Sequence, residues 1–344
     1  MSNCILLTGG TGYIGSWVAK YLLEKGYIVR LAVRDKNKTG KYAFLNAIAE
    51  KSSGKLEIWE ADLLKEASYN NAAEGADAII HMASPFTLRF KDAEKELIQP
   101  ALEGTKNVLA AANHSTTVKK VVLTSSVAAV FGDNIDQKEK GLNQLDESHF
   151  NTTSSVNHQP YSYSKILAEN EAWKIAKAQN KWNLVVINPS FVLGPSLSED
   201  SNSESLAFMQ DLIGGKFRMG APDIYFGFVD VRDVANAHIV ALENKTAEGR
   251  HILAERTASI LELVELLKAN YGDKLKLPLM KAPKWLLYLI GPLFGLSRKF
   301  INRNVAHPIQ LDTTKSKEKL GLSYRDLNET VVDMVEQMNK SKTT

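Results

Sequence analysis

Cysteine is nearly absent from this chain, and neither an apolar run of membrane-spanning length nor a block of basic residues occurs. Cys4 is the only cysteine among 344 residues, so an intrachain disulfide is excluded. The 42 basic and 39 acidic residues nearly balance, and nucleic acid is therefore not an expected partner. The first residues lack the basic and apolar regions of a secretory signal. We expect a cytoplasmic protein.

One strongly apolar stretch, residues 285–296, needs a separate explanation. It is shorter than the ~20 residues that span a bilayer, and a Gly-Pro pair interrupts it, so we expect no transmembrane segment. Packing inside a smaller lobe over the substrate is the simplest interpretation. A contact with another subunit or with a membrane surface is the alternative, and we expect either a monomer or a homodimer.

Apolar runs typical of β-strands alternate with helical patterns through the first half of the chain. Continuous runs such as 78–80 and 121–123 are typical of strands buried on both faces. Repeated β-α units predict an α/β fold with a doubly wound parallel (Rossmann) sheet. The expected strands are 3–8, 28–33, 56–60, 78–81, 119–124 and 183–188.

After Pro189 the pattern becomes mixed, which predicts a smaller C-terminal α/β lobe that binds the substrate. Residues 133–159 are polar and are expected to form a long loop, after which Pro160 opens a helix. The expected domains are 1–190 plus 228–254 for the dinucleotide-binding Rossmann part and 191–227 plus 255–340 for the substrate lobe.

A glycine-rich turn separates the first strand from the first helix. Glycine lets the backbone approach a pyrophosphate closely, and the helix N-terminus offers free N–H groups and a positive dipole end. This order of strand, turn and helix predicts a dinucleotide site. The expected cofactor-binding residues of the turn are Gly9, Thr11, Gly12, Tyr13, Ile14 and Gly15.

The end of the second strand selects between NAD and NADP. Arg34 follows the apolar Val33, and its guanidinium suits an adenine face and a 2′-phosphate. Lys41, or alternatively Lys38, could add a second positive charge, whereas Asp35 could face a ribose instead. We therefore favour NADP(H). Further expected cofactor contacts follow later strands: Asp62 and Leu63, then Ala83 and Ser84, and Thr124.

A tyrosine and a lysine, Tyr161 and Lys165, lie four residues apart on one face of the helix that follows Pro160. A nearby ammonium and a nicotinamide charge both favour the phenolate, so we expect a lowered tyrosine pKa. The pair suits proton transfer in carbonyl/alcohol interconversion. Residues 124–126 close the fifth strand, and a hydroxyl in this segment can hold the substrate oxygen beside Tyr161. No ligand spacing suggests a metal.

These segments resemble the extended short-chain dehydrogenase/reductase family, in particular the branch of dihydroflavonol reductases, cinnamoyl-CoA reductases and microbial aldehyde or ketone reductases. The matching segments are 8–15, 33–35, 81–85, 104–109, 123–126, 161–165 and 188–195. The resemblance implies a catalytic Ser126, a second phosphate-binding cation at Lys41, and a nicotinamide-flanking pair, Pro189 and Ser190. It also implies that Tyr161 and Lys165 bind the cofactor as well as catalyse.

The resemblance implies NADPH-dependent reduction of a small aldehyde or ketone to an alcohol, with the reverse oxidation possible. Phe131 stands where plant dihydroflavonol reductases carry asparagine, and residues 157–165 depart from the cinnamoyl-CoA reductase signature. Phe86, Phe131 and Phe226 are candidates for an apolar pocket wall, with core packing as the alternative. The rival functions are an epimerase, a dehydratase or a hydroxysteroid dehydrogenase of the same superfamily, and a non-catalytic NADP sensor.

Overall fold

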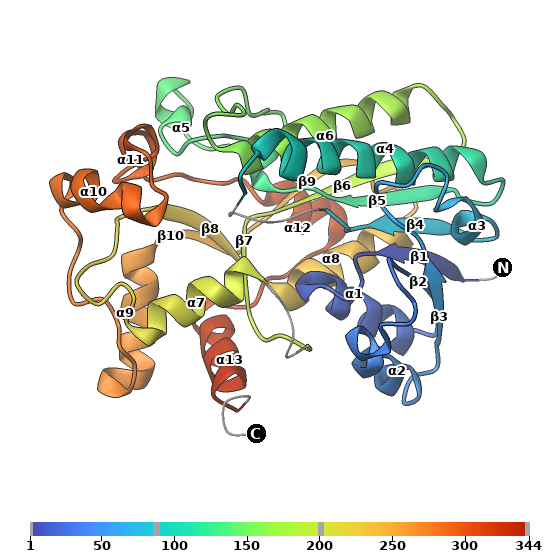
Figure 1. Cartoon of the computed structure of the whole chain (residues 1–344), viewed down its shortest axis with the longest axis horizontal. Helices are drawn as coiled ribbons and strands as arrows, with labels where there is room; N and C mark the ends of the chain where they lie inside the picture. The colour runs from blue at the N-terminus through green and yellow to red at the C-terminus, as the bar shows by residue number, and fades with distance from the viewer. Residues whose placement is uncertain (1–2, 85–89, 199–202, 341–344) are drawn as a thin grey trace.

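Seven parallel strands form the larger sheet, in the order β3-β2-β1-β4-β5-β6-β9 (Figure 1). This computed structural model describes residues 3–84, 90–198 and 203–340. The strands are β1 (Cys4–Thr8), β2 (Ile28–Val33), β3 (Lys55–Glu60), β4 (Ala78–His81), β5 (Lys120–Thr124), β6 (Asn183–Pro189) and β9 (Gly249–Leu253). The six expected strands are present within one residue at each end, which confirms the predicted doubly wound sheet.

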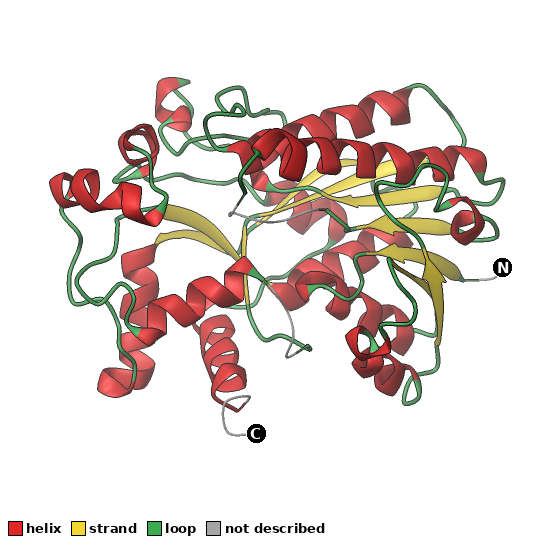
Figure 2. Ribbon diagram, viewed as in Figure 1, coloured by secondary structure: helices red, strands yellow, loops and turns green. Residues whose placement is uncertain are grey.

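Helices cover both faces of this sheet (Figure 2). Alternate residues of β1 serve the two faces: Ile5 and Leu7 pack with one helical layer, and Leu6 packs with the other. Continuous apolar strands are the sequence counterpart of this double burial. The first layer contains α1 (Tyr13–Glu24), α2 (Ala43–Ala49) and α8 (Val231–Glu243), and the second contains α3 (Asn70–Ala73), α4 (Gln99–His114) and α6 (Pro160–Lys177).

Strand β1 lies between β2 and β4, so the chain reverses direction across the sheet at this point. The crevice beyond the carboxyl ends of such strands is the usual ligand site of doubly wound folds. Thr8, at the end of β1, is in register with His81 at the end of β4. The fold therefore brings the glycine turn and the segment after β4 to one edge.

A smaller mixed sheet joins β7 (Phe191–Leu193), β8 (Tyr225–Asp230) and β10 (Arg256–Ser259). Strand β8 is central, parallel to β7 and antiparallel to β10. A separate apolar cluster surrounds this sheet. Its helices are α7 (Glu204–Gly214), α9 (Ile260–Tyr271), α10 (Lys284–Ile290), α11 (Arg298–Asn304) and α13 (Leu327–Lys340).

Short helical turns complete the description. They are η1 (Thr39–Lys41), η2 (Glu94–Ile98), η3 (Val127–Ala129), α5 (Asp136–Glu139), η4 (Gly272–Lys274), η5 (Gly291–Phe294) and α12 (Thr314–Leu320).

The long loop expected over residues 133–159 contains the single turn α5 and is tied to the smaller lobe through Asp133. This buried carboxylate accepts from His158 at 2.8 Å, from Arg303 at 2.6 Å and from Asn304 at 2.7 Å. It also accepts from Gln159 at 2.8 Å, two residues before Tyr161. The bonds hold the pKa of Asp133 below its usual range despite burial. The entrance to α6 is thereby fixed by contacts from distant segments.

Candidate active site

The glycine turn has a geometry that only small residues permit. Gly9 has φ +72°, and a Cβ there would lie 2.7 Å from the backbone nitrogen of Ala83. A Cβ on Gly15 would overlap the carbonyl oxygen of Gly9. Helix α1 begins behind Gly12 without a side-chain cap, so its first N–H groups are left for a ligand. The turn fits a pyrophosphate.

The turn also anchors neighbouring segments. The hydroxyl of Thr8 accepts from the amides of Met82 and Ala83 at 3.1 Å each, and it therefore donates its own proton to Nδ1 of His81 at 2.8 Å. Tyr13 is buried, and its hydroxyl donates to the carbonyl of Gly194 at 2.6 Å. The predicted contact between Tyr13 and the cofactor would therefore involve the backbone of Tyr13 and not its side chain.

The expected 2′-phosphate cations lie on the surface beyond β2. Arg34 and Lys41 are exposed, and neither has an acidic partner within the part of the chain that the structure describes. Asp35 is occupied locally: its carboxylate accepts from the amide of Asn37 at 3.0 Å and lies 3.8 Å from Nζ of Lys38. The arrangement leaves Arg34 and Lys41 available to an anion and engages Asp35 within its own loop.

The adenine-side residues after β3 are held by their own turn. Asp62 accepts from the amide of Leu64 at 2.9 Å, and the carbonyl of Leu63 accepts from Asn107 of α4 at 2.7 Å. The second bond gives Asn107 a structural role that ties α4 to the turn after β3.

Ser126, Tyr161 and Lys165 meet where β5 ends against α6. Ser126 caps η3, with its hydroxyl oxygen accepting from the amide of Ala128 at 3.1 Å. The side chain of Ser126 acts on the Tyr161 hydroxyl and lowers its pKa. Nζ of Lys165 lies 5.6 Å from the centroid of the Tyr161 ring. Tyr161 and Lys165 are close because both lie on α6, whereas Ser126 reaches them because the end of β5 packs against this helix.

The expected lowering of the tyrosine pKa does not hold in the protein without cofactor. Burial raises the pKa of Tyr161 to about 12, which outweighs the opposing hydrogen bond from Ser126. Burial also lowers the pKa of Lys165 to about 8, and the charge of Glu169 acts in the opposite direction. At neutral pH Tyr161 is therefore a phenol, the form required to donate a proton.

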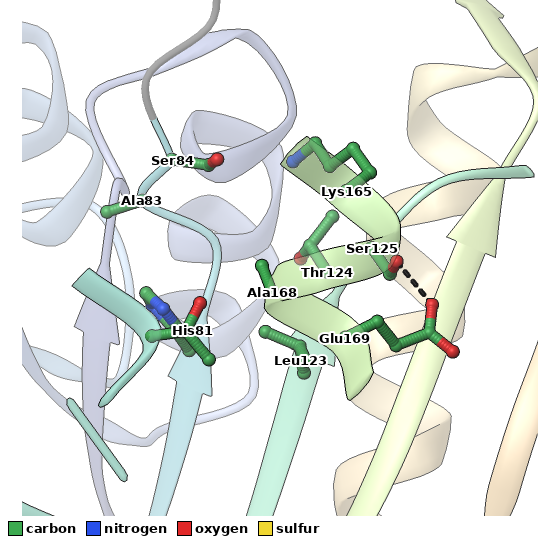
Figure 3. Close-up of a pocket in the computed structure, with 10 residues that line it drawn as sticks. His81, Ala83, Ser84, Leu123, Thr124, Ser125, Lys165, Ala168 and Glu169 are labelled. Carbon is green, nitrogen blue, oxygen red and sulfur yellow. Dashed lines mark hydrogen bonds between the residues drawn. The ribbon is translucent and has the colours of Figure 1, made fainter. Parts of the chain in front are cut away.

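A small polar pocket lies between the end of the sheet and α6 (Figure 3). Lys165 enters it from α6, and the segment that follows β4 forms its other side. Four lining residues were predicted as site residues: Ala83, Ser84, Thr124 and Lys165. Four polar or titratable lining residues were not: His81, Thr105, Ser125 and Glu169. The hydroxyl of Thr124 is bonded to Nε2 of His238 at 2.7 Å.

Glu169 is the principal residue that sequence reasoning missed. Its side chain is fully buried, and its carboxylate accepts from Ser125 at 2.5 Å and from Asn188 at 2.8 Å (Figure 3 shows the Ser125 bond). It also forms an ion pair with Nε of Arg250 at 2.5 Å. Asn188 bonds the backbone carbonyl of Ser126 at 3.1 Å as well. Glu169 thus connects the serine segment with the helix of Tyr161. The sequence does contain a sign of this residue, because Glu169 follows Lys165 by four residues and therefore lies on the same face of α6.

The remaining predicted residues have mixed surroundings. Pro189 ends β6, and the hydroxyl of Ser190 is buried without a partner among the described residues. Phe131 is packed in an apolar cluster with Leu145 and Ile309, and Phe226 lies against Phe191 and Phe228.

Phe86, the third candidate for the pocket wall, lies outside the described residues. In that same described part, no three His, Cys, Asp or Glu side chains lie close enough together to hold a metal ion.

The strand order and the glycine turn define a dinucleotide-binding Rossmann protein, and the Ser-Tyr-Lys cluster at the sheet edge suits oxidoreductase chemistry. The chain belongs to the NAD dependent epimerase/dehydratase family, whose profile matches residues 5–254. This confirms the resemblance to the extended short-chain dehydrogenases/reductases.

Curated relatives include plant reductases. The chain is 35% identical to "Cinnamoyl-CoA reductase CAD2" of Medicago truncatula, over 99% of this chain and 97% of the relative. It is 36% identical to "Anthocyanidin reductase" of Arabidopsis thaliana, over 78% of this chain and 80% of the relative.

The fold is also similar to that of solved reductase structures. The yeast methylglyoxal/isovaleraldehyde reductase Gre2, complexed with NADPH, superposes with a TM-score of 0.81, 26% identity and 99% coverage of both chains. Gre2 of Candida albicans with NADPH gives a TM-score of 0.78, 31% identity and 98% coverage of both chains.

Proposed function

We propose that this protein is an NADPH-dependent carbonyl reductase that converts an aldehyde or ketone to an alcohol, reversibly. The observation that carries the proposal is the convergence of Ser126, Tyr161 and Lys165 at the edge of the dinucleotide crevice, with Nζ of Lys165 5.6 Å from the centroid of the Tyr161 ring. The reductase names of the relatives support it. The rival epimerase function shares the fold, but the exposed Arg34 and Lys41 suit a 2′-phosphate that NAD lacks.

The residues present fit the cofactor. Gly9, Gly12 and Gly15 leave space and free amides for the pyrophosphate, and Arg34 and Lys41 would hold the 2′-phosphate. Other residues expected near the cofactor are Thr11, Ile14, Asp62, Leu63, Ala83, Ser84, Thr124, Pro189 and Ser190. NADPH, when bound, supplies the hydride.

The protein side of the reaction rests on three side chains. The Ser126 hydroxyl oxygen accepts the Ala128 amide, and its proton can turn from Tyr161 to the substrate carbonyl oxygen. Tyr161, protonated at neutral pH, donates its proton to that oxygen as the alcohol forms. The Lys165 ammonium stabilises the resulting phenolate and binds the nicotinamide ribose.

The proposal includes a division of the chain into two domains. We assign dinucleotide binding to residues 1–190 plus 228–254 and substrate binding to residues 191–227 plus 255–340. Phe131 and Phe226 are kept as candidates for the pocket wall, which would suit an apolar or aromatic carbonyl compound. A screen of NADPH oxidation with aliphatic, aryl and α-dicarbonyl compounds identifies the preferred class.

The test replaces Tyr161 and uses a neighbouring tyrosine as control. Tyr161→Phe removes the proton donor and should lower kcat by roughly 10²–10⁴-fold while NADPH still binds, because the ring and its packing remain. Tyr163→Phe, on the same helix, should keep kcat. Turnover of Tyr161→Phe at the rate of the unmodified protein would overturn the assignment of this residue.

A further inference from the structure

Exposed apolar side chains gather on the smaller lobe. Eight large apolar residues of the described chain are exposed, and five of them belong to this lobe. A soluble surface normally scatters such residues singly, so their concentration needs a reason. The five are Met219 (85% exposed), Leu279 (72%), Met280 (57%), Trp285 (64%) and Leu289 (67%).

The backbone places these five residues on neighbouring segments. The amide of Leu279 donates to the carbonyl of Arg218 at 3.1 Å, and the amide of Ala221 donates to the carbonyl of Met280 at 3.1 Å. Helix α10 begins four residues after Met280, and Trp285 and Leu289 lie one turn apart on its exposed face. Figure 1 shows α10 at one end of the long axis. We name these five residues the lobe-tip patch.

The chain segment that carries four of the five lobe-tip residues and continues through α11 is rich in positive charge. Residues 274–311 contain seven lysines and arginines and no aspartate or glutamate. Two of the seven are paired: Lys281 with Asp223 at 2.5 Å, and Arg303 with the acidic residues of the loop before α6. The other five have no ion pair within the described ranges; they are Lys274, Lys276, Lys284, Arg298 and Lys299.

We propose that the lobe-tip patch docks the protein onto an anionic lipid surface. Exposed Trp, Leu and Met side chains enter the headgroup boundary, and the surrounding lysines and arginines remain among the lipid phosphates. A second copy of the chain is a poor occupant, because an isologous contact would bring this positive surface against itself. No helix of the described residues is long and apolar enough to cross a membrane, so the contact is with the surface only.

The experiment is co-sedimentation of the full chain with two kinds of vesicle, phosphatidylcholine alone and phosphatidylcholine mixed with phosphatidylserine. We expect binding to the mixed vesicles, weakened by salt as the Debye length falls from about 10 Å at 0.1 M to about 3 Å at 1 M. Trp285→Glu should abolish it. The double change Arg298→Ala with Lys299→Ala should weaken it roughly 25-fold, since each charge near the surface contributes about fivefold.

Matched controls come from the Rossmann domain. Leu64→Glu alters an equally exposed apolar residue, and Lys119→Ala with Lys177→Ala removes two exposed lysines; these variants should bind as the unmodified chain does. Turnover of a small soluble aldehyde shows that each variant is folded. Equal binding to both vesicles, or lobe-tip variants that bind normally, would overturn the proposal. So would dimer dissociation by Trp285→Glu in ultracentrifugation, or preferential binding of poly-glutamate over vesicles.

Discussion

Replacing Glu169 by glutamine should destabilise the fold and also shift the pH dependence of catalysis. The substitution keeps the shape but removes the charge that faces Arg250 and turns an NH2 group toward existing donors. Removing one partner of a buried ion pair costs about 3–5 kcal/mol. With an unfolding entropy of about 2.1 cal/mol/K per residue, a chain of this length loses roughly 1.4 °C of Tm per kcal/mol. We therefore expect a Tm lower by roughly 4–7 °C in calorimetry.

The second effect acts on Lys165. Burial lowers its pKa to about 8, while the Glu169 carboxylate raises it. Without that carboxylate the lysine loses its proton at a lower pH, so the alkaline fall in kcat should move to lower pH. Glu171→Gln, on the same helix and paired with Lys174 near the surface, should change neither quantity appreciably. An alkaline limb that stays in place in Glu169→Gln would refute the electrostatic role, and an unchanged Tm would refute the structural one.

Three further outcomes follow from other parts of the molecule. Arg34→Ala should raise the KM for NADPH by roughly 10–100-fold, the equivalent of about 1.5–3 kcal/mol for a charge-assisted bond, and leave the KM for NADH nearly unchanged; equal losses would contradict the 2′-phosphate role. Gly15→Ala should abolish cofactor binding measured by NADPH fluorescence, because the new methyl overlaps the carbonyl of Gly9; retained affinity would argue against a rigid turn. Burial lowers the pKa of His81 to about 3 and of His238 to about 4. Between pH 6.5 and pH 4 the unfolded chain therefore binds more protons than the folded chain, so the stability of the fold decreases as the pH is lowered. Equal urea midpoints at pH 7 and pH 5 would contradict this.

Local pattern predicted the fold well, because each of its signals acts over a few residues. Strands that are buried on both faces have continuous apolar sequences. The turn after β1 requires glycine because Gly9 has a positive φ and a Cβ on Gly15 would overlap the backbone. The Tyr161–Lys165 pairing follows from helix geometry alone. These features needed no knowledge of which strands are neighbours.

The electrostatics of the site could not be predicted in the same way. A lysine beside a tyrosine suggested a lowered tyrosine pKa, but burial raises the pKa of Tyr161 to about 12. The extent of burial depends on how α6 packs against the end of the sheet, which a spacing of four residues does not encode. The role of Phe131 could not be predicted from the sequence either. Its aromatic side chain would suit a pocket wall, but in the structure it packs in an apolar cluster.

The sequence by itself determined the parallel sheet, the pyrophosphate turn, the cations after β2 and the tyrosine-lysine helix, since each is a short-range pattern. Tertiary structure alone decided that Ser126 meets Tyr161, that Arg250 from β9 neutralises Glu169 beside Lys165, and that Asp133 fixes the entrance to α6. These contacts join residues that are far apart in the chain. The contacts of Glu169 exist because β5, β6 and β9 are adjacent in the sheet, an order set by packing of the whole chain.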